Sequence, residues 1–160
     1  MAIDAFQRLA SSIDGQVEKV EAGTADHLIA VALGYVLFAV TDPAAFKLMF
    51  RVERLDSRRQ EYRSTASEAI APAAAAVGAY FRSDQPMGDP VMVRRVVGLW
   101  SLSQGVAELL IAGQLGPLDQ GEEIARALLP DMVREMFGTN ARNDPQDLEF
   151  IVRTSEAQRS

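Results

Sequence analysis

Residues 25–40 read ADHLIAVALGYVLFAV, and this stretch decides the fold class. Its apolar side chains would occupy every side of a helix, whereas a surface helix has a single apolar face. A helix of this kind lies in the middle of a bundle and packs against partners on two sides. Thr24 precedes the stretch as a candidate N-cap, and Asp26 is favourably placed in the first turn.

Helical patterns flank this stretch on both sides. Upstream, residues 2–20 repeat apolar side chains at spacings of three and four. Downstream, Asp42-Pro43 combines a cap residue with a proline and opens a short helix, PAAFKLMF, and Asp89-Pro90 opens a longer one in the same way. The helix that Asp89-Pro90 opens covers residues 90–115, and the remaining predicted helices cover residues 57–82 and 119–137.

The glycines and prolines fit this helical pattern. Pro72 is expected to kink or break its helix, Pro130 is expected to bend another, and Gly138 is a candidate terminator. No alternating apolar run lies between turn signals, so the sequence predicts no strand. The predicted fold class is all-α, an antiparallel helical bundle of about six helices. It covers residues 1–138, and a polar tail over residues 139–160 is expected to be partly disordered or to form one short helix.

Composition excludes several classes of protein. The 160 residues include 48% hydrophobic and 24% charged side chains, which is typical of one globular domain. The absence of cysteine excludes a disulfide scaffold, a thiolate metal site and a cysteine nucleophile. The net charge of −6 disfavours duplex-DNA binding, since phosphate neutralisation supplies most of that affinity. No signal peptide is visible, and the longest uncharged run, residues 28–41, is shorter than a membrane helix, so we expect a cytoplasmic protein.

Catalytic and metal-binding patterns are mostly missing. His27 is the only histidine, so a metal site with several histidine ligands is excluded, as is a pair of catalytic histidines. It lies in the first turn of a predicted helix, where we expect a partly exposed side chain with a structural role. The segment GQLGPLDQG, residues 113–121, lacks dinucleotide-binding spacing and predicts a helix stop and a turn. We therefore expect no enzyme, no cofactor and no metal.

One polar stripe interrupts the long apolar helix predicted over residues 90–115. Ser101, Gln104 and Glu108 share one face of that helix, and Trp100 lies beside Gln104 at i+4. Burial of an amide and a carboxylate destabilises a fold unless both groups find polar partners. Three interpretations stay open at this point. The stripe faces an internal pocket that receives a ligand's polar atoms, pairs across a subunit interface, or faces solvent.

Aromatic side chains from four helical segments indicate where a pocket would lie. Such side chains are more often core than ligand site, yet helical bundles bind small molecules between helices lined in this way. We predict an effector site between residues 25–40, 57–82 and 90–115, with Gln104 and Glu108 as its polar anchors. The predicted walls are Tyr35, Phe38, Phe50, Tyr80, Phe81 and Trp100.

Two motifs resemble a known family. GYVLFAVTDPAAFKLMFR (residues 34–51) and LWSLSQGVAELLIAGQL (residues 99–115) are similar to the C-terminal ligand-binding and dimerisation domain of TetR-type transcriptional regulators. Within that family, the pattern resembles the subgroup named for a Trp…His-Gly motif. Trp100 and Gly105 match the motif, and Gln104 stands where the family usually has histidine.

The resemblance implies a sensor domain that dimerises and binds a small, mostly apolar effector. In such regulators, effector binding changes the placement of two N-terminal helix-turn-helix heads that read DNA. No such head precedes residues 2–20, so we expect either an internal start or a sensor domain without a head. We expect a homodimer through residues 90–115 and 119–137, and no contact of this chain with nucleic acid or membrane. The alternative is a structural homodimerisation module with a filled core and no ligand.

Overall fold

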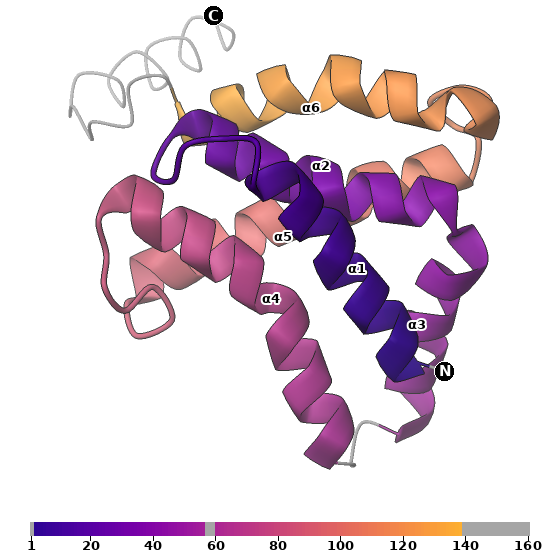
Figure 1. Cartoon of the computed structure of the whole chain (residues 1–160), viewed down its shortest axis with the longest axis horizontal. Coiled ribbons are helices and arrows are strands. Elements are labelled where there is room, and N and C mark those ends of the chain that lie inside the picture. The colour runs from indigo at the N-terminus through magenta and orange to yellow at the C-terminus, as the bar shows by residue number, and fades with distance from the viewer. Residues whose placement is uncertain (1, 57–59, 139–160) are drawn as a thin grey trace, which may run out of the picture.

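Helix α2 (Ala25–Thr41) runs through the middle of the molecule, and every side chain from His27 to Ala39 is buried. The structure is a computed structural model that describes residues 2–56 and 60–138. Over these ranges the chain forms helices and turns without a strand, which confirms the all-α prediction (Figure 1). The other elements are α1 (Ala2–Val17), α3 (Pro43–Asp56), α4 (Gln60–Phe81), α5 (Pro90–Ile111), the 3₁₀ turn η1 (Leu118–Gln120) and α6 (Gly121–Phe137).

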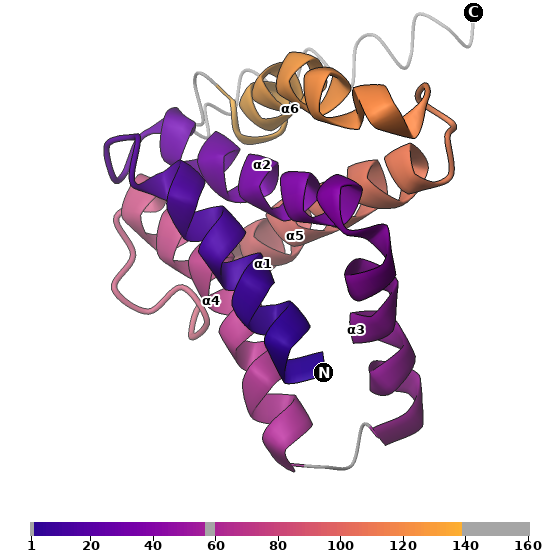
Figure 2. The same cartoon turned by 45° about the vertical axis from the view of Figure 1, so that its right-hand side comes forward.

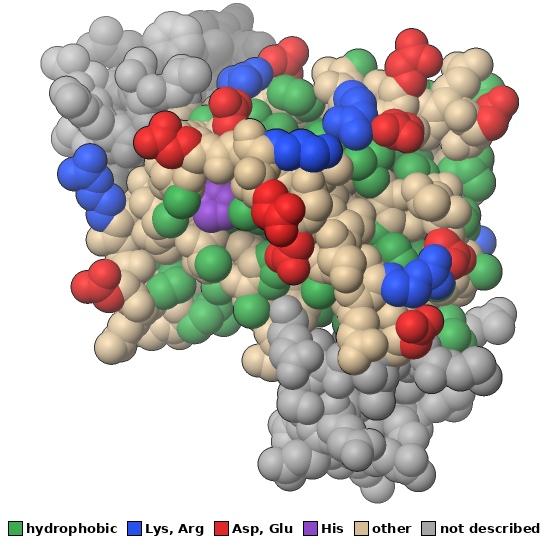
Figure 3. Space-filling view, viewed as in Figure 1, with side chains coloured by type: hydrophobic (Ala, Val, Ile, Leu, Met, Phe, Trp, Pro, Cys, Tyr) green, Lys and Arg blue, Asp and Glu red, His purple; other side chains and the backbone are tan. Residues whose placement is uncertain are grey.

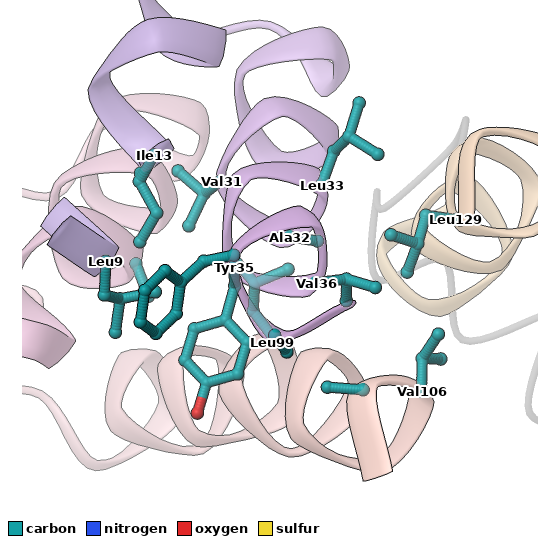
Figure 4. Packing of buried hydrophobic residues seen from close by; sticks show 14 of the residues in the cluster. Leu9, Ile13, Val31, Ala32, Leu33, Tyr35, Val36, Leu99, Val106 and Leu129 are labelled. Carbon is teal, nitrogen blue, oxygen red and sulfur yellow. The ribbon is translucent and has the colours of Figure 1, made fainter. Parts of the chain in front are cut away.

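The other five helices all contact α2. α1 crosses one side of α2, whereas α5 and α6 cover its other sides (Figure 1, Figure 2). α3 and the N-terminal half of α4 extend away from α6, and α1 packs against both of them. Figure 4 shows Ile13 of α1, Leu99 of α5 and Leu129 of α6 arranged around α2. The apolar pattern over residues 25–40 therefore predicted the central position of this helix correctly.

The α1–α2 crossing depends on a glycine. A Cβ atom at Gly34 would lie 2.5 Å from Ile13 Cα, so the crossing has no room for a side chain. Ser12 Oγ donates a hydrogen bond to the Gly34 carbonyl oxygen at 2.8 Å, which gives this hydroxyl a partner at the contact. Direct backbone contact at Gly34 therefore fixes the point at which α1 meets α2.

Three of the helices begin at the predicted cap residues. In each case a side-chain oxygen accepts a hydrogen bond from a backbone N–H two or three residues later, at distances of 2.8 to 3.3 Å. These residues are Thr24 for α2, Asp42 for α3 and Asp89 for α5. Local sequence therefore sets the N-terminal boundaries of these helices.

The end of α5 differs from the prediction. The helix stops at Ile111 rather than at residue 115, because Gly113 adopts φ +71° and turns the chain out of the helix. Gly113 N–H donates to the Leu110 carbonyl and Gln114 N–H donates to the Leu109 carbonyl, which closes the helix with a Schellman motif. Of the two glycines that could end this helix, the first one does so.

α4 and α6 end within one residue of their predicted positions, whereas α3 is longer than predicted. α3 continues to Asp56, beyond the predicted PAAFKLMF segment. Pro72 and Pro130 lie inside α4 and α6, each of which is one continuous helix, so of the kink or break expected at Pro72 the break does not occur. Gly138, with φ +74°, ends α6 as predicted. The predicted tail lies outside the described residues.

The helix boundaries also determine whether any helix is long enough to cross a membrane. Within the described part of the chain, no single helix is both long enough and apolar enough to cross a membrane. α2 and the start of α3 reach that combination only together, across a bend of 105°.

Candidate functional site

Tyr35 connects the buried central helix to α5. Its ring is buried and packs edge-to-face on Phe46 of α3, with ring centroids 5.7 Å apart. Figure 4 shows the ring leaving α2 toward α5, with the hydroxyl at its far end. The Tyr35 hydroxyl donates a hydrogen bond to Gln104 Oε1 of α5 and accepts one from Trp100 Nε1 at 3.4 Å. Three of the predicted site residues are therefore in direct contact.

The hydrogen bonds continue along α5. Gln104 Nε2 donates to Glu108 Oε1 at 3.1 Å, one helical turn further on. We call Trp100, Tyr35, Gln104 and Glu108 the Tyr35–Gln104 network. The sequence predicted that the Gln104 amide has a polar partner. This prediction is confirmed, since the amide contacts Tyr35 and Glu108. No buried side-chain nitrogen or oxygen atom among the described residues lacks a partner.

The network extends from the core to the surface. Tyr35 is buried, Gln104 is half-buried, and Glu108 and Ser101 are exposed. Trp100 is the only tryptophan of the chain and keeps 38% of its surface exposed, which is high for so large an apolar side chain. On a single copy of the chain, the polar stripe of α5 thus lies at the surface, and only Gln104 reaches inward.

Two phenylalanines of α3 line the apolar side of Tyr35. Phe46 is fully buried, and Phe50 is half-buried with its ring 5.1 Å from that of Phe46. The predicted wall included Phe50 but not Phe46, although Phe46 precedes Phe50 by one helical turn in the PAAFKLMF segment. That i, i+4 pair was the available signal.

The other predicted wall residues are Phe38, Tyr80 and Phe81, and their ring contacts involve residues outside the network. Phe38 is buried on α2, with the Arg8 guanidinium of α1 5.8 Å from its ring centre. Tyr80 and Phe81 lie at the end of α4, 4.8 Å apart by their ring centres. The turn before α2 contacts this end of α4 at Ala79, so the pair lies near the start of α2, whereas Tyr35 lies near its middle.

Tyr80 and Phe81 form an aromatic corner between α4, α5 and α6. The Tyr80 hydroxyl donates to the Gly138 carbonyl oxygen at 3.2 Å. The Arg95 guanidinium stacks 3.7 Å above the Phe81 ring, and Phe137 of α6 lies beside the same ring. Arg95 was not predicted as part of a site, since nothing local in the sequence pairs residues on two different helices. This corner holds three helix ends together and is separate from the Tyr35–Gln104 network.

His27 has a structural position, as the sequence had suggested, although it is buried rather than partly exposed. Its Nδ1 atom accepts a hydrogen bond from Gly23 N–H at 3.4 Å, within the turn that leads into α2. Burial lowers the pKa of His27 below its ordinary value, because the charged imidazolium loses hydration there. The described residues include no group of three or more His, Cys, Asp or Glu side chains that could hold a metal ion.

Comparison with known families agrees with the architecture. The chain falls in the class of all-helical bundle domains, with one buried central helix and a polar network on a covering helix. A family model described as "Tetracyclin repressor-like, C-terminal domain" matches residues 28–132, and the chain belongs to this family. The match includes the whole of both motifs, at residues 34–51 and at residues 99–115. Neither a curated protein nor a solved structure matches the chain.

Membership of this family indicates the general role of the domain. Domains of the family generally dimerise and bind small effectors, and the family is generally non-enzymatic. The role indicated is therefore that of a regulator's effector-binding and dimerisation domain.

Proposed function

We propose that residues 1–138 form the effector-sensing and dimerisation domain of a TetR-like transcriptional regulator that acts in the cytoplasm. The observation that carries this proposal is the Tyr35–Gln104 network, which links the buried centre of the bundle to the outer side of α5. A ligand regulates such a protein only if it binds two dimer geometries with different affinity. A hydrogen-bonded network that extends from the core to the surface, as this one does, is suited to transmit that difference.

The proposed effector site lies at Tyr35, Trp100 and Gln104, with Phe46 and Phe50 as its apolar wall. The aromatic groups favour a mostly apolar ligand, and the amide and phenol supply the few polar contacts that orient a small molecule. Trp100 supports this position because its indole is partly exposed while its Nε1 atom faces Tyr35. Phe38, Tyr80 and Phe81, which the sequence also suggested, have other contacts and are left out of this site.

The proposed dimer surface lies on α5 and α6. Large exposed apolar patches on soluble domains usually mark interfaces. Figure 3 shows a different face, over α1, α2 and α6, where acidic and basic side chains are mixed among apolar ones. The large apolar side chains that α5 and α6 leave exposed are Val91, Val97, Trp100, Leu109, Leu128 and Met136. In this arrangement the chain itself makes no contact with nucleic acid.

One observation favours the alternative of a structural homodimerisation module. The Tyr35 hydroxyl and the Gln104 amide already have protein partners, so the fold is satisfied without a ligand. A bound effector would have to exchange one of these hydrogen bonds for its own.

Trp100 emission distinguishes the two functions. We would titrate the chain with a neutral probe (N-phenyl-1-naphthylamine), a cationic one (rhodamine 6G) and an anionic one (1-anilinonaphthalene-8-sulfonate). A sensor shows a saturable change in Trp100 emission with at least one probe, and Gln104→Ala weakens that binding while the dimer persists. Tyr80→Phe, which alters the separate aromatic corner, leaves the binding unchanged. If no probe changes the emission and Gln104→Leu raises the melting temperature, the structural module is the better description.

A further inference from the structure

The outer side of α5 carries three exposed polar residues in one line. Arg94, Ser101 and Glu108 are seven residues apart, which is nearly two helical turns, so they share a face. We call them the outer stripe of α5. The stripe lies opposite the buried line of this helix, which is formed by Met92, Val96, Leu99, Ser103, Val106, Ala107 and Leu110. These three side chains therefore point directly away from the core.

The backbone beside Ser101 is open to close approach. Gly98 and Gly105 lie one turn before and one turn after it on the same side of α5. A Cβ atom at Gly105 would meet nothing within 4 Å, and one at Gly98 would meet only Met136 Sδ at 3.7 Å. A second helix could therefore cross here near the lower limit of interaxial distance, about 8 Å.

The charges of the stripe are arranged symmetrically about Ser101. Arg94 precedes Ser101 by seven residues and Glu108 follows it by seven, so an antiparallel second α5 that crosses at Ser101 brings opposite charges together twice. Each pair would lie about 10 Å along the helix from the crossing, within reach of these two long side chains. Among the described residues Arg94 and Glu108 have no ion-pair partner, and the Glu108 carboxylate accepts a hydrogen bond from the neutral Gln104 amide.

Apolar side chains of α6 are also arranged symmetrically, about Met132. Leu128, Met132 and Met136 follow one another at intervals of four and form a ridge beside α5. Met136 lies against the position of Gly98, so residues near Met132 lie next to Ser101 on the antiparallel α5. The two ends of the ridge, Leu128 and Met136, are 37% and 47% exposed, and Met132 between them is half-buried. A twofold axis beside Ser101 would therefore place Leu128 against Met136 of the partner subunit.

We propose that two copies of this chain join with their α5 helices antiparallel and crossed at Ser101, so that Arg94 of the partner subunit pairs with Glu108. This inference rests on the proposed dimerisation and adds its register and a residue from the partner. Such an interface is isologous, because the same stripe serves both copies. The partner's Arg94 then joins the Tyr35–Gln104 network through Glu108, so an effector that displaces Gln104 also disturbs a contact between subunits.

Charge reversal tests this register. Arg94→Glu and Glu108→Arg each turn two attractions into two repulsions, and each should raise the dimer dissociation constant by about tenfold, as measured by sedimentation equilibrium. The double variant restores opposite charges at both places and should return the constant to within about threefold of wild type. Arg126→Glu is the control for Arg94→Glu, since it makes the same change in net charge at a residue that pairs with Glu122 on α6.

The outcomes separate the register from dimerisation itself. All three stripe positions are exposed, so the variants should fold, and circular dichroism checks this. A wild-type dimer whose dissociation constant is unaffected by the single reversals, or is not restored in the double variant, overturns the crossing at Ser101 while the proposed function stands. A wild-type chain that is monomeric at micromolar concentration overturns both.

Discussion

Tyr35 donates its hydroxyl hydrogen bond to the side-chain oxygen of Gln104, which joins the buried helix α2 to the outer part of α5 across 69 positions of sequence. The contact gives a polar partner to an amide on an otherwise apolar helix. It also places a titratable phenol and an indole N–H side by side at the edge of the core. The position of α5 on α2 therefore depends on directional contacts as well as apolar packing.

Removal of the Tyr35 hydroxyl should loosen this connection without loss of packing. Tyr35→Phe retains the ring against Phe46 and loses the hydrogen bonds to Gln104 and Trp100, so we expect a loss of about 1 kcal/mol in unfolding free energy and altered Trp100 emission. Urea unfolding and emission spectra measure the two effects. Tyr80→Phe is the matched control, since it removes a phenol from the aromatic corner and should leave the Trp100 spectrum unchanged. Identical spectra for wild type and Tyr35→Phe would contradict the assigned contact.

Gly34 should tolerate no side chain. Gly34→Ala places a Cβ atom 2.5 Å from Ile13 Cα, and because the obstacle is backbone, α1 has to move, at a cost of about 3 kcal/mol. Gly15→Ala on α1 is the matched control, because no atom lies within 4 Å of its added Cβ. This control should stabilise the helix by up to about 1 kcal/mol. Equal melting temperatures for the two variants would show that α1 does not contact α2 at Gly34.

Asp42 should have two separable contributions to stability. Its Oδ1 atom caps α3 by accepting from Ala45 N–H at 2.9 Å, and its Oδ2 atom accepts from Arg8 at 2.7 Å, which ties α1 to the same corner. Asp42→Ala loses both contacts and should cost about 1–2 kcal/mol. Asp42→Asn retains the cap and loses only a partly exposed ion pair, so it should cost less than about 1 kcal/mol, as should Arg8→Ala. Denaturant unfolding that shows Asn to be as damaging as Ala would contradict this division.

Stability should decline in mild acid because of His27. Burial lowers the pKa of His27, so between that lowered value and the ordinary value of about 6.5 the unfolded chain binds more protons than the folded one. The unfolding free energy therefore rises with pH across this window. The stability that neutral His27 contributes is fully present above the window and is lost as the pH falls through it. The backbone hydrogen bond from Ala45 and the pairing with Arg8 lower the pKa of Asp42, but that group titrates below the window. Melting temperatures between about pH 5 and 8 should show the slope in wild type and a flatter profile in His27→Gln, and equal slopes would contradict it.

Local signals in the sequence predicted most of the fold. The boundaries of α2 follow from Thr24 at its start and Asp42-Pro43 at its end, and all-round apolarity gave its central position. The end of α5 could not be read in the same way, because Gly113 and Gly116 both adopt positive φ and only the hydrogen bonds of the folded turn decide between them.

The candidate site was predicted in part, since Tyr35 of α2 contacts Trp100 and Gln104 of α5 as expected. Trp100, Gln104 and Glu108 share one helix, so their proximity followed from the sequence. Tyr80 and Phe81 were also grouped with them. Their separate position follows from the pairing of α4 with the start of α2, which depends on tertiary packing. No local pattern encodes that packing.

Dimerisation through α5 and α6 underlies both the proposed function and the crossing at Ser101. Sedimentation equilibrium of the 160-residue chain at micromolar concentration tests it most directly. We expect a species of twice the 17.4 kDa chain mass, because a single copy leaves Val97, Leu109, Leu128 and Met136 exposed. A single species of 17.4 kDa under the same conditions would contradict this central claim.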